Sequence, residues 1–389
     1  MSYLCGPAST ELSVSMNPDC VDSNDQAARV ELKHWVTGLI LSVSAFVIIS
    51  TNLLVAAALL RLLFKKSSQS WCFVLNLALA DTLVGIAITG LATEDLNIHN
   101  INQNQRGYIG ADPPAQGKTR CLIMMAFVAS PCTASIMSIF LISVDRYAAI
   151  KTPLRYNRLS GKGTAVGSLL TLWISAFTVG FMPVMVRQLQ TDGYSGFCTF
   201  FSVVHQVGII VLFICCFFPL FSVIVYIYLD ILKIAYSHQK QICQIRQAGS
   251  RTAEHDQPQE HHHKHHQLRI CHAGHFKALK TVAVLVGCLF ILWCPFFVAC
   301  LVQLLCKSCK ITELLENYLW LLGLSNSLIN PLVYACWQKE VRLQLAAMFS
   351  CFRDRLSAAG PKRVTERCDP QPPVLTPAMV SAGDIHNPS

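Results

Sequence analysis

Charged side chains are scarce in this sequence of 389 residues, and their scarcity excludes most soluble classes of protein. Asp, Glu, Lys and Arg make up 14% of the chain, whereas an ordinary soluble domain has roughly 25%. Hydrophobic residues reach 53%, so there is too little charge to cover the apolar surface in water. The chain is also too apolar for a disordered protein and too long for a disulfide-stapled mini-protein. The composition therefore predicts a membrane protein.

Seven long apolar runs together contain a single Asp, Glu, Lys or Arg. A bilayer core of roughly 30 Å needs about 20 apolar residues in a helix, and barrel strands would be shorter and alternate in polarity. We therefore predict an all-α membrane protein, a seven-transmembrane helix bundle. The runs are 36–60, 71–93, 121–144, 163–186, 203–229, 281–306 and 317–338.

Lys and Arg are distributed unevenly between the segments that join these runs. Of the 31, 23 lie on one side of the predicted membrane and 8 on the other. Because such an excess marks the cytoplasmic side, the N-terminus is predicted to be extracellular and the protein to be multi-pass in the plasma membrane. The first 35 residues contain no basic stretch followed by a short apolar one, so no cleaved signal peptide is expected.

The chain divides into four predicted segments. They are an extracellular N-terminus (1–35), the seven-helix domain (36–337), a short amphipathic helix on the membrane surface (338–350) and a disordered cytoplasmic tail (351–389). The inner loop 237–275 is rich in histidine, and we interpret it as a flexible polar loop in preference to a metal site. Cys351 directly follows the amphipathic helix and is predicted to be palmitoylated.

Six of the 18 cysteines lie on the predicted outer side, and six cysteines allow 15 pairings. They are Cys5, Cys20, Cys121, Cys198, Cys306 and Cys309. A bridge between Cys121 and Cys198 would pin the loop after the fourth run over the mouth of the bundle. A bridge between Cys306 and Cys309 would close a tight loop, and it is favoured over free thiols or a metal site in an oxidising compartment. Whether Cys5 and Cys20 pair is left open.

Asp81 is the one Asp, Glu, Lys or Arg within the seven runs. An intramembrane carboxylate is costly and therefore marks a functional site. Oxygen ligands from Asp, Ser and Asn suit a small hard cation such as Na⁺, and a hydrogen-bonded network without an ion is the alternative. The polar residues at a similar predicted depth are Asn52, Ser135, Asn326, Ser327 and Asn330.

Asp145-Arg146-Tyr147 marks the inner end of the third run. An arginine there can offer its planar donors to a partner in an inner cavity, or it can reach to the membrane interface. Prolines interrupt the fifth, sixth and seventh runs at Pro219, Pro295 and Pro331, where each removes a backbone hydrogen bond and permits a kink. A helix hinged in this way can swing its inner end.

Together these motifs resemble the class A, rhodopsin-like G-protein-coupled receptors. Within that class, the chain is similar to lipid-amide receptors in the segments 72–83, 276–281, 318–323 and 337–345. Those receptors raise cyclic AMP through the stimulatory G protein. The resemblance covers about residues 36–350. The matching pieces are Asn52, Leu77-Ala-Leu-Ala-Asp81, Cys121, Asp145-Arg146-Tyr147, Trp173, Cys198, Pro219, Trp293-Cys-Pro295 and Asn330-Pro-Leu-Val-Tyr334.

The resemblance implies a role for several residues. Asp145, Arg146 and Tyr147 would couple to the G protein, with Tyr334 reorganising toward the inner cavity. Trp293 would form the floor of the ligand pocket. Arrestin and receptor kinases are implied as further partners. The implied sodium site consists of Asp81, Ser135, Asn326 and Asn330, with Na⁺ as an allosteric ion and no other cofactor.

The expected ligand is a lipid. Val128 shares a helix face with Arg146, near the outer end of the third run. Amine receptors of this class have an acid there, and a cation buried beside Val128 would lack a partner. An apolar lining instead favours a long acyl chain, at about 0.8 kcal/mol per buried CH₂, and Glu316 would hold the polar head. The predicted ligand-binding residues are Val128, Ala129, Phe200, Phe201, Trp293, Phe296, Phe297, Glu316 and Trp320.

The sequence departs from the lipid-amide receptors at the rim of this pocket and at its inner end. Met124 and Asn317 stand where those relatives have Arg, so the preference for a charged head group is open. His275 stands where many class members place an acid opposite Arg146. We therefore expect a weak inactive-state lock and signalling without ligand.

Alternative functions follow from the same features. One is a receptor for another lipid, cannabinoid-like or lysophospholipid-like, or one with a different G-protein coupling. A transporter is less favoured because the sequence shows no repeated halves. An enzyme is not expected, since the runs contain no nucleophile–base arrangement, metal-ligand spacing or glycine-rich phosphate loop.

Overall fold

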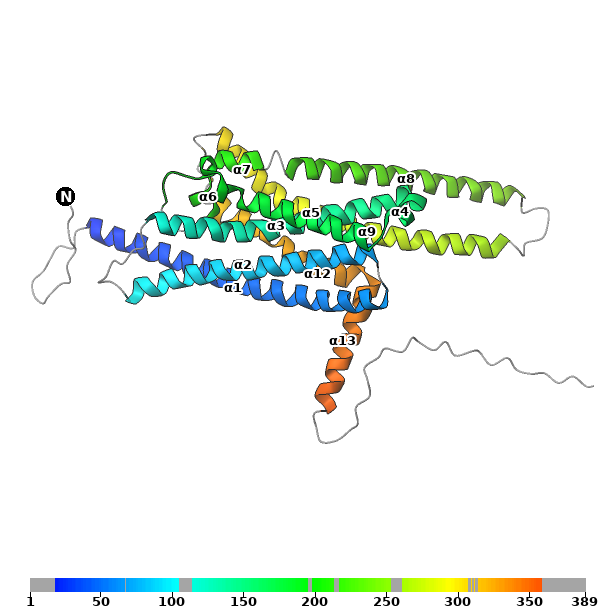
Figure 1. Ribbon diagram of the computed structural model, residues 1–389, viewed down its shortest axis with the longest axis horizontal. Helices are drawn as coiled ribbons and strands as arrows, with labels where there is room; N and C mark the ends of the chain where they lie inside the picture. The colour runs from blue at the N-terminus through cyan, green and yellow to red at the C-terminus, as the bar shows by residue number, and fades with distance from the viewer. Residues whose placement is uncertain are drawn as a thin grey trace, which may run out of the picture.

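The structure is a computed structural model that describes residues 18–66, 68–104, 114–194, 198–212, 217–252, 261–306, 309, 311 and 314–358. These parts of the chain are helical, with one isolated β-bridge between Gln190 and Val204. The long helices run side by side in one bundle, and α13 (Lys339–Ala358) leaves the bundle at a steep angle (Figure 1). The prediction of an all-α seven-helix bundle is confirmed.

Five helices contain an uninterrupted stretch that is long and apolar enough to cross a membrane, by the composition of the described residues. They are α1 (Pro18–Lys65), α2 (Gln69–Asn104), α3 (Pro114–Lys151), α5 (Lys162–Met185) and α9 (His261–Leu305). The fifth and seventh predicted runs are each divided into shorter elements. The fifth run contains α7 (Gln206–Leu212) and the start of α8 (Phe218–Thr252). The seventh run contains the end of η3 (Leu315–Leu319), α11 (Trp320–Leu324) and α12 (Asn326–Trp337).

The divisions coincide with local features of the sequence. Pro219 is the second residue of α8, so the predicted interruption of the fifth run lies at the boundary between α7 and α8. Pro331 lies inside α12 and Pro295 inside α9, as the sequence places them. The element η3 is a π-helix, a wide turn that is frequent at functional sites.

α3 is the central helix, and small residues bring its neighbours close. α1 packs along α2, and both α2 and α5 pack against α3. A Cβ atom at Gly180 of α5 would lie 2.2 Å from Ser130 Oγ and 2.8 Å from the Ser130 backbone nitrogen on α3. Only glycine permits this approach, which is typical of helix packing in membranes.

The two ends of the bundle are built differently. At one end, the disulfide Cys121–Cys198 ties the segment before α6 (Phe200–Val203) to the start of α3, and Cys306 is bonded to Cys309. Thr199 and Ser202 form a capping box that fixes α6. We name this the disulfide end. The opposite end holds Arg146 and the short helix α4 (Pro153–Leu159), and we name it the Arg146 end.

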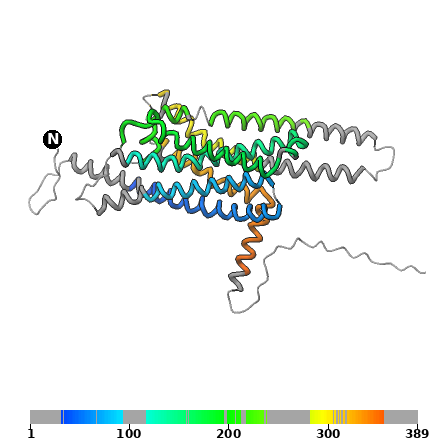
Figure 2. The backbone as a smooth tube through the Cα atoms, in the orientation of Figure 1, coloured from blue at the N-terminus to red at the C-terminus, as the bar shows by residue number. Residues whose placement is uncertain are grey.

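Several helices are longer than predicted. α8 and α9 continue through the described parts of 237–275, where we expected a flexible loop, since a formed helix propagates readily. α13 extends to Ala358, past the predicted end at 350, and α1 begins at Pro18. Figure 2 shows the long helices of the bundle as a backbone tube. Cys5 and the tail beyond 358 lie outside the described residues, as does the side chain of Cys20.

Candidate functional site

A partly open cavity lies between the helices toward the disulfide end. α3 and α5 form one wall, and α9 with Trp320 of α11 forms the other. Its described lining contains no Asp, Glu, Lys, Arg or His. The lining residues are Met125, Val128, Ala129, Cys132, Thr133, Ile136, Val179, Gly180, Pro183, Phe200, Ile209, Phe217, Trp293, Phe296, Phe297 and Trp320.

Aromatic rings of α9 form one side of the cavity. The Trp293 ring stacks on Phe297 with 5.9 Å between centroids and meets Phe296 edge-on at 6.1 Å. Gly323 of α11 leaves room for the indole, because a Cβ atom there would lie 3.0 Å from Trp293 Cζ3. The position of Trp293 is therefore set by contacts from both α9 and α11.

The Asp81 carboxylate lies in the middle of the bundle, fully buried, and joins three helices. Ser135 of α3 donates to its Oδ1 at 2.7 Å, and Ser327 of α12 donates to the same oxygen at 2.7 Å. Asn330 Nδ2 of α12 donates to Oδ2 at 2.8 Å. Among the described residues, no cationic side chain pairs with Asp81, so its negative charge is stabilised by neutral donors alone.

Two amide oxygens beside this network are buried without a hydrogen bond in the described structure. They are Oδ1 of Asn326 and Oδ1 of Asn330. A small hard cation prefers oxygen ligands, and a carboxylate, hydroxyl groups and free amide oxygens supply them here. The residues present therefore fit a sodium ion.

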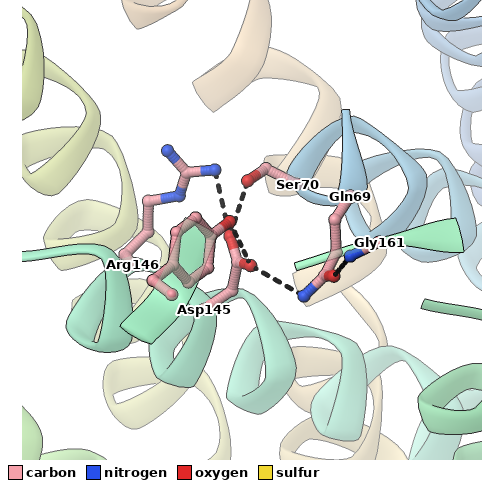
Figure 3. Close-up of polar contacts among 6 residues, drawn as sticks. Gln69, Ser70, Asp145, Arg146 and Gly161 are labelled. Atoms are coloured by element: carbon pink, nitrogen blue, oxygen red, sulfur yellow. Dashed lines mark hydrogen bonds and ion pairs between the residues drawn. The ribbon is translucent and has the colours of Figure 1, made fainter. Parts of the chain in front are cut away.

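A second carboxylate, Asp145, organises the Arg146 end (Figure 3). Gln69 Nε2 and Ser70 Oγ of α2 donate to it at 3.2 and 2.6 Å, and the Tyr156 hydroxyl of α4 donates at 2.9 Å. Arg146 Nη2 adds an ion pair at 3.0 Å. Since Gln69 Oε1 also accepts from the backbone N–H of Gly161 at 3.1 Å, the start of α5 is tied to the same cluster.

An ion pair joins α3 to α8 at this end. Lys151 Nζ lies 2.6 Å from Asp230 Oδ2, and the Tyr147 hydroxyl donates to the same oxygen at 2.6 Å. The Lys151 ammonium and the Tyr147 hydroxyl hold the pKa of Asp230 below its usual range. The cluster therefore fastens the two helices beside Arg146.

Comparison with known proteins identifies the architecture. Residues 51–334 match the family model described as 7 transmembrane receptor (rhodopsin family). The chain belongs to the rhodopsin family of seven-transmembrane receptors. It is a G-protein-coupled receptor in a membrane, takes a small-molecule agonist and is not an enzyme. The family match therefore rules out the alternative prediction of a transporter.

Two similar receptors share a name, and a third has a different one. The receptor is 42% identical to the human glucose-dependent insulinotropic receptor over 80% of its own chain and 85% of that protein. It is 40% identical to the rat protein of the same name, over 80% of its own chain and 61% of that protein. It is 28% identical to the rat histamine H2 receptor, over 85% and 82% of the two chains.

Most of the predicted ligand residues lie together in the receptor. The structure places Val128, Ala129, Phe200, Trp293, Phe296, Phe297 and Trp320 in the wall of the cavity. Phe201 lies behind it, with its ring centroid 6.1 Å from that of Phe296. Glu316 lies in η3, and its side chain is outside the described part of the chain.

The other predicted sites are partly brought together. Ser135 and Asn330 bond to Asp81, whereas the third expected ligand, Asn326, lies nearby without a hydrogen bond to it. The Tyr334 hydroxyl is buried without a hydrogen bond among the described residues. The sulfur of Cys351 is disulfide-bonded in this structure, and a thioester with palmitate would need the reduced thiol.

Sequence reasoning missed residues that only the folded receptor brings to the cavity. Cys132 and Thr133 lie one helical turn beyond Val128 and Ala129, so the spacing of four along α3 could have revealed them. Val179, Gly180, Pro183, Ile209 and Phe217 carry no such signal. At the Arg146 end, Gln69, Ser70 and Tyr156 were also missed, because nothing in the sequence relates them to Asp145.

Proposed function

We propose that the receptor binds a lipid-like agonist, a fatty-acid ethanolamide or a lysophospholipid, and signals through the stimulatory G protein to raise cyclic AMP. The observation that carries the proposal is the cavity whose described lining has no charged side chain. A long acyl chain gains about 0.8 kcal/mol for each CH₂ buried there. A ligand cation would find no counter-charge beside Val128, which lines the cavity and is 4% exposed.

The coupling is proposed from similarity. The sequence resembles lipid-amide receptors that signal through the stimulatory G protein, and it is 42% identical to the human glucose-dependent insulinotropic receptor. We place the receptor in the plasma membrane with its N-terminus outside, so that the disulfide end faces the ligand and the Arg146 end faces the G protein. Arrestin and receptor kinases are proposed as partners on the same grounds.

A sodium ion is the proposed allosteric ligand of the Asp81 network. The ion would be held by oxygen atoms of Asp81, Ser135, Ser327 and Asn330. The amide oxygen of Asn326 would be a further ligand. The ion would supply a positive charge that neutralises the buried carboxylate. A receptor that binds Na⁺ better in one conformation is shifted toward that conformation.

The decisive experiment uses purified full-length receptor in lipid nanodiscs with the stimulatory heterotrimer. GDP release is measured with oleoyl ethanolamide, an oleoyl lysophosphatidylcholine and a monoacylglycerol. We expect faster release with at least one of them, and some release without ligand because His275 offers no acidic lock. No acceleration by any of the three would refute the proposed function.

The alternative within the same class is another lipid or another G protein. The Met124 side chain, which packs against the core in place of the relatives' Arg, favours a head group without negative charge. Parallel measurements with cannabinoid-like lipids and with inhibitory and Gq-type heterotrimers distinguish these cases. A response confined to one of those heterotrimers would replace the stimulatory coupling while leaving the lipid site in place.

A further inference from the structure

Two polar groups in the cavity lack hydrogen-bond partners. Thr133 of α3 and Trp293 of α9 both line it and are only 5% and 8% exposed. The indole Nε1 of Trp293 is buried without a partner among the described residues. The Thr133 hydroxyl likewise makes no hydrogen bond within the described structure, and it lies on the lining of an otherwise hydrophobic space.

Other hydroxyls of α3 and another buried indole form hydrogen bonds within the protein. On α3, the hydroxyls of Ser130 and Ser143 donate to the carbonyls of Ala126 and Ile139, each four residues earlier, at 2.8 Å. The indole of Trp173 donates to Asn76 Oδ1 at 2.9 Å. Buried polar groups are normally paired in this way, so the unpaired Thr133 hydroxyl and Trp293 indole, which line the same cavity, point to a partner supplied by the ligand.

The two groups select a particular chemistry. An indole N–H only donates, whereas a threonine hydroxyl both donates and accepts. A ligand hydroxyl matches both, since its oxygen accepts from Trp293 and its proton is donated to Thr133. A plain hydrocarbon chain would leave both groups desolvated and unpaired, which is unfavourable.

The depth of Thr133 determines which part of the ligand reaches it. Thr133 lies about 18 Å along α3 from Cys121, at a helical rise of about 1.5 Å per residue, and Cys121 holds the segment over the disulfide end. A lipid whose head group stays near that end therefore brings the middle of its acyl chain, and not its head, to Thr133.

From this arrangement, and resting on the proposed lipid function, we infer that the cavity prefers acyl lipids with a hydroxyl group in mid-chain. Thr133 and Trp293 are the residues that determine this preference. The hydroxylated chain is distinguished from an unsubstituted chain by two hydrogen bonds within an otherwise apolar site.

The test compares two probes that differ by one oxygen. Oleoyl ethanolamide and its mid-chain hydroxyl analogue, ricinoleoyl ethanolamide, compete for the full-length receptor in nanodiscs. We expect the hydroxylated probe to bind roughly three- to tenfold more tightly to the unmodified receptor. Thr133→Val and Trp293→Phe should each reduce this ratio to near one. Thr82→Val is the matched control, because its buried hydroxyl already bonds to Ala78 O on α2 and lies outside the cavity; it should keep the ratio.

The outcomes separate the two proposals. Binding of both probes with a ratio of one or less, or a ratio that Thr133→Val leaves unchanged, overturns the mid-chain preference and leaves the lipid function standing. Binding of neither probe overturns both. If a variant fails to reach the membrane, positional isomers on the unmodified receptor decide: equal affinity for a hydroxyl next to the carbonyl and for one in mid-chain contradicts the inference.

Discussion

The disulfide end and the Arg146 end of this receptor are stabilised by different interactions. The cavity is lined mainly by hydrocarbon and aromatic groups, and the Trp293 indole nitrogen in its wall is unpaired among the described residues. At the Arg146 end, the single carboxylate of Asp145 accepts hydrogen bonds from Gln69, Ser70 and Tyr156. It also forms an ion pair with Arg146. One end is therefore stabilised mainly by apolar packing, and the other mainly by directional bonds that can be exchanged.

The difference indicates how occupancy of one end can affect the other. Dispersion and burial in the cavity are non-directional, so a ligand acts there by filling space around Trp293. Hydrogen bonds and ion pairs at the Arg146 end are directional, and a small movement of α3 or α8 replaces one set by another. The Asp81 network lies between the two ends and joins α2, α3 and α12.

The largest effect is expected from Trp320→Ala in the cavity. Removing a buried aromatic anchor typically weakens binding by about 2 to 4 kcal/mol, or roughly 30- to 1,000-fold. Potency of the active lipid in a cyclic AMP assay should fall by that factor while surface expression, measured by an epitope tag, is kept. Unchanged potency would mean that the ligand binds elsewhere. Trp337→Ala, an exposed tryptophan at the end of α12, is the control.

The next largest effect is expected at the Arg146 end, from Asp145→Ala. The change leaves the half-buried donors of Gln69, Ser70 and Tyr156 without their acceptor and releases Arg146, which is destabilising. We expect a lower melting temperature of the purified receptor together with higher ligand-free cyclic AMP. Asp354→Ala on the exposed face of α13 should change neither. A stable variant with unchanged basal signal would show that the cluster does not restrain Arg146.

A smaller effect is expected in the middle of the bundle. If Na⁺ binds at Asp81, replacing NaCl by choline chloride should change agonist affinity by about fivefold or more. Asp81→Asn removes the charge that holds the ion, so affinity in this variant should no longer depend on sodium. A sodium effect that persists in Asp81→Asn would place the ion elsewhere, and no effect in either protein would leave a purely hydrogen-bonded network.

The smallest effect is expected from the Lys151–Asp230 pair, because exposed ion pairs contribute little. Lys151→Met or Asp230→Asn should raise basal cyclic AMP by only about twofold, and the exchanged pair Lys151→Asp with Asp230→Lys should restore it. Since Lys151 lowers the pKa of Asp230, the pair is intact at neutral pH and is lost only on acidification below the usual range of an aspartate. Basal signalling that the exchange fails to restore would argue against a clamp between α3 and α8.

Much of the fold was predictable because hydrocarbon length is a local property. The apolar runs identify the helices, and a single carboxylate such as Asp81 stands out among them. Boundaries were less predictable. α8 and α9 continue beyond the membrane, and the seventh run is divided at Ser325, because helix propagation and π-type turns depend on hydrogen bonds that composition does not reveal.

The linear chain was sufficient to identify a membrane receptor with seven helices, and it predicted an apolar pocket above Trp293 and a polar centre at Asp81. Folding alone established which neutral donors surround Asp145, that Ser327 takes the place expected of Asn326 beside Asp81, and that Thr133 lies unpaired in the cavity. The physical reason is that hydrophobicity and helical spacing act within a segment. Hydrogen-bond partners and cavity walls come from residues far apart in the chain, and their meeting depends on how the helices pack.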